Sequence, residues 1–179
     1  MFETVQQLLR SRMTDDSVAM LHDDRTWTWR EHLAEASAEA SALIALSDAS
    51  RPMHVGALLG NTPAMLRSMA AAALGGYVLC GINTTRRGDG LAGDIRRADC
   101  QLVLANTEHM PLLDGLDLGG ATVVDVDGPE YRDAVAAAKP LEPIRHVVDE
   151  GGEPVTCDGS SDAQKRLSFG QEHDGRLRR

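Results

Sequence analysis

Residues 58–85 read LLGNTPAMLRSMAAAALGGYVLCGINTT, and this order of residue types decides the predicted fold. Asn61-Thr62-Pro63 can begin a helix, because Asn or Thr can cap it and the N–H that Pro lacks is not needed in the first turn. Gly75-Gly76 can end the helix, since glycine readily adopts the positive φ common at helix ends. The apolar face of the helix is predicted to consist of Met65, Leu66, Met69, Ala73 and Leu74. With strands at 55–59 and 77–82, the stretch predicts a βαβ unit.

The residues before this unit predict a β-hairpin followed by a long helix. Apolar runs at 18–21 and 26–29 are separated by a polar turn, which is typical of a hairpin. Thr28 and Glu31 have the spacing of a capping box, in which the two residues satisfy each other's backbone N–H groups. The predicted apolar stripe of the following helix is Leu33, Ala36, Ala40, Leu43 and Ile44. A short helix at 3–10 is expected to precede the hairpin.

The residues after the unit continue the alternation of helices and strands. We predict helices at 90–98, 110–113 and 129–138, and strands at 102–105 and 122–126. Strands that alternate with helices favour a parallel sheet covered on both faces. The predicted fold class is therefore α/β, with an N-terminal β-hairpin and helix followed by a Rossmann-like parallel βαβ sheet.

The last part of the chain has a different composition. The apolar pattern weakens from about Lys139, and residues 150–179 contain hardly any apolar side chains. Such a segment buries too little surface to offset the entropy lost when its backbone is ordered. We therefore expect two regions, a core domain at 1–145 and a disordered tail at 146–179.

The overall composition is that of one globular domain and excludes some functions. A formal charge of −9 argues against nucleic acid as a partner, because phosphate binding requires a basic surface. The sequence has no apolar run of 18 residues and no basic-then-apolar leader, so we expect a cytoplasmic protein that does not span a membrane. Cys80, Cys100 and Cys157 lack metal-ligand spacing, and the first two lie in or beside apolar runs, which indicates small buried thiols in a reducing compartment.

One motif suggests a ligand, and its context argues against that interpretation. Residues 88–93, GDGLAG, match the dinucleotide pattern G-x-G-x-x-G, with glycines at Gly88, Gly90 and Gly93. The physical mechanism requires those glycines to follow a strand at once, whereas the polar stretch 83–87 intervenes. An ordinary loop and helix start is therefore favoured, and a dinucleotide-dependent enzyme is kept as a weaker alternative.

Other candidate residues for catalysis or metal binding lack the necessary neighbours. The six histidines are scattered without an i, i+4 pair, and Ser160-Ser161 is not within a nucleophile elbow. We therefore assign no catalytic, cofactor-binding or metal-binding residue.

The order of short motifs nevertheless resembles one enzyme family. The segments concerned are DRTWTWRE at 24–31, VGALLGNTP at 55–63, AAALGG at 71–76 with GIN at 81–83, and the stretch 86–104 that begins RRGDG and ends DCQLVL. This ordered set, which runs from about residue 15 to 127, resembles adenylate-forming fatty-acyl-CoA ligases of the mycobacterial type.

The resemblance implies that the chain is a fragment of a larger enzyme. Full-length family members use ATP, Mg²⁺ and coenzyme A to convert a fatty acid to an acyl-adenylate and then to an acyl-CoA. They need a Ser/Thr/Gly-rich phosphate loop ending in Pro-Lys, an adenine and ribose site and a lid lysine, none of which is found here. We therefore expect a truncated ligase that is inactive alone, without cofactors of its own and able to self-associate through exposed scaffold.

Two hypotheses accompany this interpretation. For one choice of codons, reading residues 161–167 one base earlier gives Gly-Arg-Pro-Lys-Ala-Val, which resembles the end of the family's phosphate loop and suggests a frameshifted gene. The alternative is a small stand-alone α/β module that binds a partner or a nucleotide without catalysis.

Overall fold

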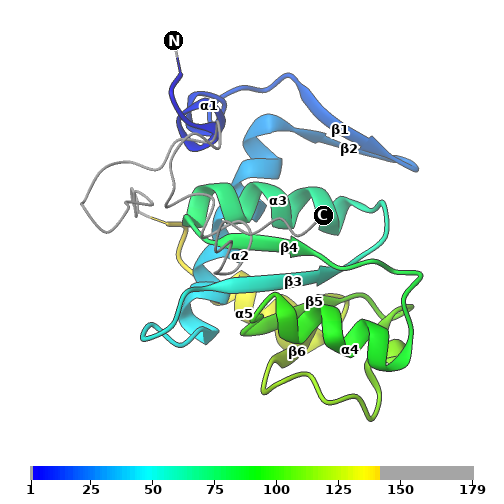
Figure 1. Ribbon diagram of the computed structural model, residues 1–179. Helices are drawn as coiled ribbons and strands as arrows, with labels where there is room; N and C mark the ends of the chain where they lie inside the picture. Colours follow the sequence, from blue (N-terminus) through cyan, green and yellow to red (C-terminus); the bar gives the residue numbers. More distant parts are fainter. Residues whose placement is uncertain (1, 142–179) are drawn as a thin grey trace, which may run out of the picture.

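The computed structural model describes residues 2–141, which form a four-stranded parallel sheet with helices on both faces and a separate β-hairpin (Figure 1). The predicted tail, 146–179, and the predicted boundary before it lie outside the described residues. In chain order the elements are α1 (Val5–Ser11), β1 (Val18–His22), β2 (Arg25–Thr28), α2 (Trp29–Leu46), β3 (His54–Leu58), α3 (Pro63–Gly75), β4 (Val78–Gly81), α4 (Gly88–Arg97), β5 (Leu102–Ala105), the 3-10 helix η1 (Met110–Leu113), β6 (Thr122–Asp125) and α5 (Pro129–Ala137).

The sheet confirms the predicted α/β class. Its strand order is β4-β3-β5-β6, and all three pairings are parallel. The central strand β3 places Gly56 between Cys80 of β4 and Val103 of β5. The hairpin β1–β2 is antiparallel and forms a sheet of its own.

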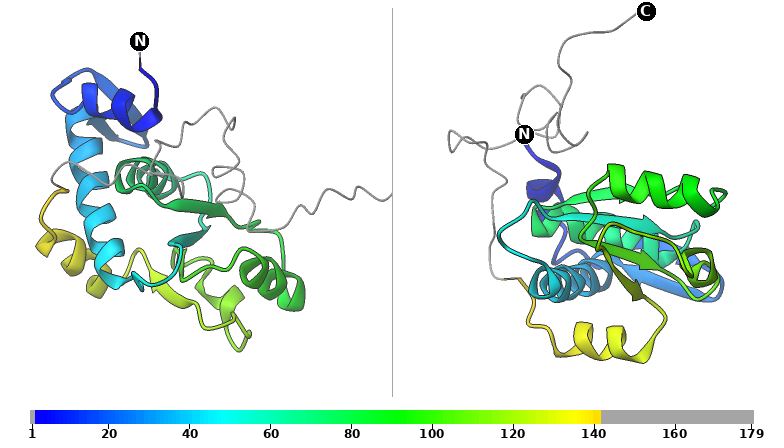
Figure 2. Two further views of the ribbon diagram at one scale, coloured as in Figure 1. Left: turned by 60° about the vertical axis from the view of Figure 1, so that its left-hand side comes forward. Right: turned by 60° about the horizontal axis from the view of Figure 1, so that its bottom comes forward.

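Side chains of β3 alternate between the two faces of the sheet, as strand geometry requires. Val55 and Ala57 face a core built with α2, α3 and α5, whereas Leu58 faces a second core built with α4 and η1. The right-hand view of Figure 2 shows α4 on one side of the sheet and α2 and α5 on the other. The core therefore has three layers, with the sheet in the middle.

Small residues allow α2 and α3 to pack closely. Ala36 and Ala40 of α2 contact a patch on α3 that includes Ala70 and Ala71. A Cβ at Gly75 would lie 2.7 Å from a ring carbon of Tyr77 and 3.3 Å from Cβ of Ala40, so this position requires glycine. The next residue, Gly76, has φ 66° and ends α3, as the sequence predicts.

The predicted apolar face of α3 is wrong in part. Leu66 and Met69 are 48% and 53% exposed, and Ser68 is fully buried in their place. The physical reason is Glu39, a buried glutamate on α2 that accepts hydrogen bonds from both Arg67 and Ser68. These bonds turn the face of α3 that carries Arg67 and Ser68 toward α2. Of the predicted stripe on α2, Leu33, Ala36, Ala40 and Leu43 are buried and Ile44 is half-buried.

No helix within residues 2–141 has both the length and the apolar character needed to cross a bilayer.

Candidate functional site

The carboxyl ends of the parallel strands form the edge of the sheet at which a ligand site is expected. β3 is followed by α3 on one face of the sheet, whereas β5 is followed by η1 on the opposite face. Because β3 and β5 are neighbours, the loops that leave them diverge at this point, which is the usual position of ligand sites in open α/β sheets. Loops 59–62 and 106–109 therefore define the candidate site, together with loop 125–128 that starts at the end of β6.

Hydrogen bonds and contacts join these loops. His109 donates from Nδ1 to Oδ1 of Asn106, within the loop after β5. The backbone N–H of Thr107 donates to Oδ2 of Asp127 at 2.9 Å, which ties that loop to the one after β6. A Cβ at Gly60 would lie 3.9 Å from Cε1 of His109, so the loop after β3 is also adjacent. The structure thus brings together three loops that the sequence did not predict to meet.

The side chains of these three loops are hydrogen-bonding groups without a lysine or arginine among them. Loops 59–62, 106–109 and 125–128 contain amide, hydroxyl, imidazole and carboxylate side chains, but neither lysine nor arginine. Phosphate groups are held by cationic side chains and by backbone N–H groups at helix ends. The loops can therefore accept hydrogen bonds from hydroxyl or amine groups, but their side chains cannot neutralise a triphosphate.

Two arginines, Arg86 and Arg87, do occur in residues 82–87 after β4, and they contact α4 and the loop itself, respectively. Arg86 Nε lies 3.0 Å from Oδ2 of Asp94 on α4. Arg87 Nη1 donates to the backbone carbonyl oxygens of Thr84 and Arg86, both at 2.7 Å. Arg86 thus ties the loop to α4, whereas Arg87 stabilises the loop itself.

The glycines of residues 88–93 lie in a setting that differs from a dinucleotide site. β4 is an edge strand, and residues 82–87 separate its end from the start of α4. A Cβ at Gly88 or Gly93 would meet no atom within 4 Å, so neither glycine serves a close approach of helix and strand. Gly88 has φ 51°, which fits a turn into α4. The motif forms the predicted loop and helix start.

The described residues include no group of three or more His, Cys, Asp or Glu side chains placed to hold a metal ion. His32 on α2 and His54 on β3 are both buried, but they lie on different elements. His54 Nδ1 donates to the carbonyl oxygen of Ala98 at 2.7 Å. The remaining candidates at the C-terminal end, which are Cys157, Ser160-Ser161, His146 and His173, lie outside the described residues.

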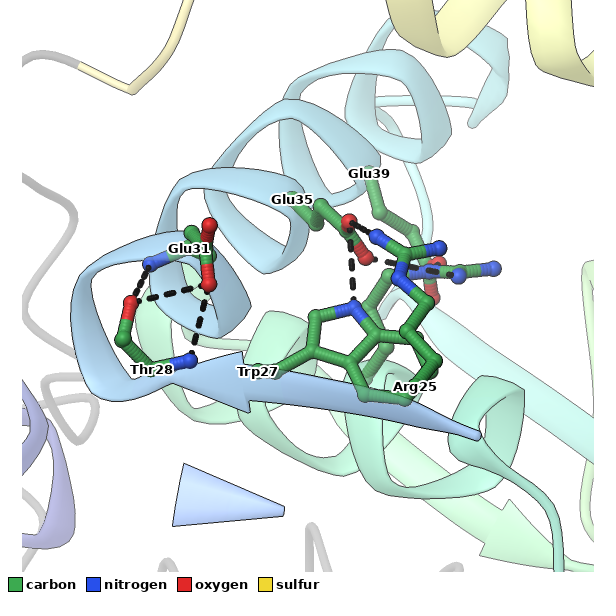
Figure 3. Close-up of polar contacts among 7 residues, drawn as sticks. Arg25, Trp27, Thr28, Glu31, Glu35 and Glu39 are labelled. Carbon is green, nitrogen blue, oxygen red and sulfur yellow. Dashed lines mark hydrogen bonds and ion pairs between the residues drawn. The ribbon is translucent and has the colours of Figure 1, made fainter. Parts of the chain in front are cut away.

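A second polar cluster lies between the hairpin, α2 and α3 (Figure 3). Glu39 is fully buried, and its carboxylate accepts from Arg67 Nε at 2.5 Å and from Ser68 Oγ at 2.6 Å. One turn earlier on α2, Glu35 accepts from Arg25 at 2.7 Å and from Trp27 Nε1 at 3.2 Å. These bonds fasten both β2 and α3 to α2.

The hairpin end of this cluster is strengthened by two further contacts (Figure 3). The guanidinium of Arg25 lies over the Trp27 ring, 4.0 Å from its centroid, in a cation–π arrangement. Thr28 and Glu31 form the predicted capping box, with the Thr28 N–H donating to Glu31 at 2.9 Å.

Burial changes the acid–base behaviour of the groups around Glu39. Burial, together with the negative charge of Glu39, raises the pKa of Tyr77 and of Tyr131 above the usual tyrosine range. Burial lowers the pKa of His32, although Glu35 and Glu39 act in the opposite direction. The Glu39 carboxylate accepts a hydrogen bond from the Arg67 guanidinium, so the two charged groups satisfy each other. We therefore interpret the cluster as a structural element. The sequence contained a signal for the burial of Glu39. This residue lies three positions after Ala36 and four before Leu43, so it falls on the predicted apolar stripe of the helix.

A small pocket of ≈ 190 Å³ is lined by Arg10, Met13, Ser37, Leu74 and Leu141. Leu74 is near the end of α3, just before β4 begins, so the pocket is at the amino-terminal edge of the sheet. Its chemistry is mostly apolar, and it shares no residue with the candidate site.

Comparison with known proteins identifies relatives of the sequence. Residues 9–170 match the family described as AMP-binding enzyme. The chain is 40% identical over 139 residues to the medium/long-chain-fatty-acid–CoA ligase FadD17 of Mycobacterium tuberculosis, an alignment that covers 78% of this chain and 27% of that protein. It is 36% identical over 160 residues to steroid-22-oyl-CoA synthetase of Rhodococcus jostii, covering 88% of this chain and 27% of the synthetase. The chain thus spans about a quarter of the length of these relatives.

Solved structures share the fold. The N-terminal domain of FACL13 from Mycobacterium tuberculosis superimposes with a TM-score of 0.71 at 21% identity, covering 79% of this chain and 38% of that domain. ATP-bound MatB from Rhodopseudomonas palustris gives a TM-score of 0.67 at 21% identity, covering 79% of this chain and 29% of MatB. At these identities the likeness concerns the fold alone.

Proposed function

Because the chain belongs to the AMP-binding enzyme family, we propose that it is the first part of a fatty-acid–CoA ligase and does not form an acyl-adenylate by itself. The observation that supports this most is the 40% identity over 139 residues to a fatty-acid–CoA ligase of which it spans only 27%. In this proposal the parallel sheet, α2 and α3 are scaffold for a nucleotide site that is completed by residues found elsewhere in the longer relatives.

The candidate site supports the second half of the proposal. Forming an adenylate requires the charge of the triphosphate and of the developing transition state to be stabilised by placed cations and N–H donors. Loops 59–62 and 106–109 offer no cation, and Asp125 and Asp127 add negative charge beside them. Within residues 2–141, no three His, Cys, Asp or Glu side chains are placed together to hold a metal ion. We therefore derive no catalytic step from these residues.

The substrates of a complete enzyme follow from its relatives as proposals. FadD17 is named for medium- and long-chain fatty acids, and the Rhodococcus synthetase for a steroid-22-oyl-CoA. Both names describe CoA esters of bulky apolar acids. We propose the same class of substrate, a hydrophobic carboxylic acid, with ATP, Mg²⁺ and coenzyme A as the other reactants of the full-length enzyme.

Three further parts of the proposal concern the chain as a whole. The division into a core at 1–145 and a tail at 146–179 remains a proposal, as does a frameshift as the origin of that tail. Sequencing the DNA that follows codon 145 tests the frameshift. The hypothesis requires that a neighbouring reading frame of this DNA encodes the phosphate loop without interruption.

We also propose that the chain self-associates, because α3 exposes Leu66 and Met69 side by side, one turn apart.

Titration calorimetry with the full chain tests the proposal against its alternatives. The ligands are Mg²⁺–ATP, a non-hydrolysable acyl-adenylate analogue and NAD, and full-length FadD17 is the positive control. We expect no heat of binding with this chain under conditions in which FadD17 binds the analogue. Micromolar binding of ATP would favour a stand-alone nucleotide-binding module, and micromolar binding of NAD would favour the dinucleotide alternative.

A further inference from the structure

The pocket at the amino-terminal edge of the sheet is formed by side chains from separate segments of the chain. It has a volume of ≈ 190 Å³ and is lined by Arg10, Met13, Ser37, Leu74 and Leu141. Arg10 belongs to α1, Ser37 to α2 and Leu74 to α3, while Met13 follows α1 and Leu141 follows α5. None of these residues lies in loops 59–62, 106–109 or 125–128, so the candidate site does not account for the pocket.

Hydrogen bonds hold the walls of this pocket in place. Gln6 Nε2 donates to the carbonyl oxygen of Leu74 at 3.0 Å and so fastens α1 to the end of α3. The N–H of Leu141 donates to Ser37 Oγ at 2.9 Å, which fixes the chain after α5 against α2. Ser37 is 2% exposed and Leu74 is 3% exposed, so both side chains belong to the interior. The packing of the helices therefore preforms the pocket.

Arg10 brings a positive charge to the pocket, and residues 2–141 supply no carboxylate partner for it. Its Nε atom is shielded from solvent and forms no hydrogen bond within that part of the chain. Arg12, by contrast, pairs with Asp15 at 2.6 Å. Burial lowers the pKa of Arg10, but arginine stays protonated at neutral pH, so its guanidinium remains charged. A partly buried cation without a counterion favours an anion beside it.

Ser37 adds a hydrogen-bond donor, and the other walls of the pocket are apolar. The Ser37 hydroxyl uses its oxygen as the acceptor for Leu141, and no acceptor within residues 2–141 takes its proton. Met13, Leu74 and Leu141 present thioether and aliphatic groups. A doubly charged ion such as phosphate would lose its water of hydration against these walls without further cations to replace it. The lining therefore suits a single negative charge joined to an apolar body.

We propose that the pocket binds a small aliphatic carboxylate. The carboxylate accepts hydrogen bonds from the Arg10 guanidinium and the Ser37 hydroxyl, and the aliphatic chain packs against Met13, Leu74 and Leu141. An apolar cavity of about 150 Å³ accommodates benzene, so a pocket of ≈ 190 Å³ suits an acid of about eight non-hydrogen atoms, such as hexanoate. The proposal is independent of the proposed function, because it concerns a different edge of the sheet and requires no part of the longer relatives.

Calorimetric titration of the full chain with sodium hexanoate tests the affinity. Acetate carries the charge without the longer apolar chain, and 1-hexanol carries the apolar chain without the charge. We expect hexanoate to bind with a Kd of about 1 mM or below, and each analogue to bind at least about tenfold more weakly. The proposal is overturned if hexanoate shows no heat of binding in that range, or if either analogue binds as tightly.

A spectrum of the chain labelled with ¹³C at the methionine methyl groups locates the bound hexanoate. Met13 lines the pocket, whereas Met110 begins η1 beside the candidate site. We expect hexanoate to shift the Met13 resonance, which is assigned from its loss in Met13→Leu, and to leave the Met110 resonance unchanged. A shift of Met110 without a shift of Met13 would place the acid elsewhere and overturn the proposal.

Matched arginine variants identify the charged contact. Arg10→Met keeps most of the side-chain length but removes the charge, whereas Arg12→Met removes an exposed charge that is paired with Asp15. We expect Arg10→Met to weaken hexanoate binding at least about tenfold and to leave 1-hexanol binding unchanged, while Arg12→Met changes neither. Circular dichroism checks that each variant is folded. Equal losses in the two variants, or an unchanged affinity for hexanoate in folded Arg10→Met, would overturn the proposal.

Discussion

Replacing Arg67 by methionine should destabilise the fold strongly, because the substitution leaves a buried carboxylate without its ion-pair partner. Glu39 is fully buried, and Arg67 Nε lies 2.5 Å from its carboxylate. Methionine keeps most of the length of the side chain, so packing against α2 changes little. The expected loss therefore arises from the unpaired charge.

The magnitude follows from the remaining contacts. Removing one partner of a buried ion pair costs about 3–5 kcal/mol. Glu39 keeps the hydrogen bond from Ser68 Oγ at 2.6 Å, so we expect the lower end of that range. A loss of about 3 kcal/mol corresponds to a fall in Tm of roughly 10 °C for a domain of this size. As a control, Arg30→Met breaks a bidentate pair with Asp16, in which both side chains are at least half exposed, and should have a much smaller effect.

Urea unfolding of the full chain, followed by tryptophan fluorescence and circular dichroism, measures these changes. A double variant, Glu39→Gln with Arg67→Met, removes both charges and should be less destabilised than Arg67→Met alone, because no unpaired charge remains buried. The reasoning is refuted if Arg67→Met costs no more than Arg30→Met, or if the losses of the two single variants add up in the double variant.

Three further predictions concern the same scaffold. Thr28→Ala should cost about 1 kcal/mol in urea unfolding, because it removes the side-chain cap of α2, and a loss no larger than that of Thr14→Ala would contradict the role of the capping box. His32 has a pKa lowered first by burial, so its neutral form favours the folded state; stability should fall as the pH drops below about 6.5. His32→Leu should flatten the dependence of the unfolding free energy on pH, whereas His22→Gln, near the hairpin turn, should leave it unchanged. The same pH dependence in the unsubstituted chain and in both variants would refute the assignment to His32. Leu66→Ser with Met69→Ser should reduce self-association measured by light scattering, and an unchanged mass distribution would exclude that surface of α3.

Much of the fold could be predicted because its signals are local. The capping box of Thr28 and Glu31 and the glycines that end α3 each occupy a few consecutive residues, and the structure has both where the sequence places them. The inward face of α3 could not be predicted in the same way. A helix rich in alanine differs little in hydrophobicity from one face to another. The contacts of Arg67 and Ser68 with Glu39 therefore decide which face of α3 points inward, and Glu39 is 28 and 29 residues away from them in the sequence.

The candidate site depends almost wholly on long-range information. Asn106, His109 and Asp127 are ordinary loop residues in the sequence, and only the strand order β4-β3-β5-β6 shows that their loops meet where the connections diverge. The close approach of Cys100 to β3 is also invisible locally, because its Sγ lies 3.2 Å from where a Cβ on Gly56 would be, 44 residues away in the sequence. The sequence predicted Cys100 to be buried, which is confirmed, whereas Cys80 is only partly so.

A pyrophosphate-release assay of the full chain tests the central claim most directly. The reaction contains ATP, Mg²⁺, coenzyme A and fatty acids from short to long, and full-length FadD17 is the positive control. We predict no release above that of a reaction without protein, because loops 59–62, 106–109 and 125–128 of the candidate site supply no cation for the triphosphate. Release above background that is abolished by Gly75→Val, a substitution that forces Tyr77 out of place, would contradict it.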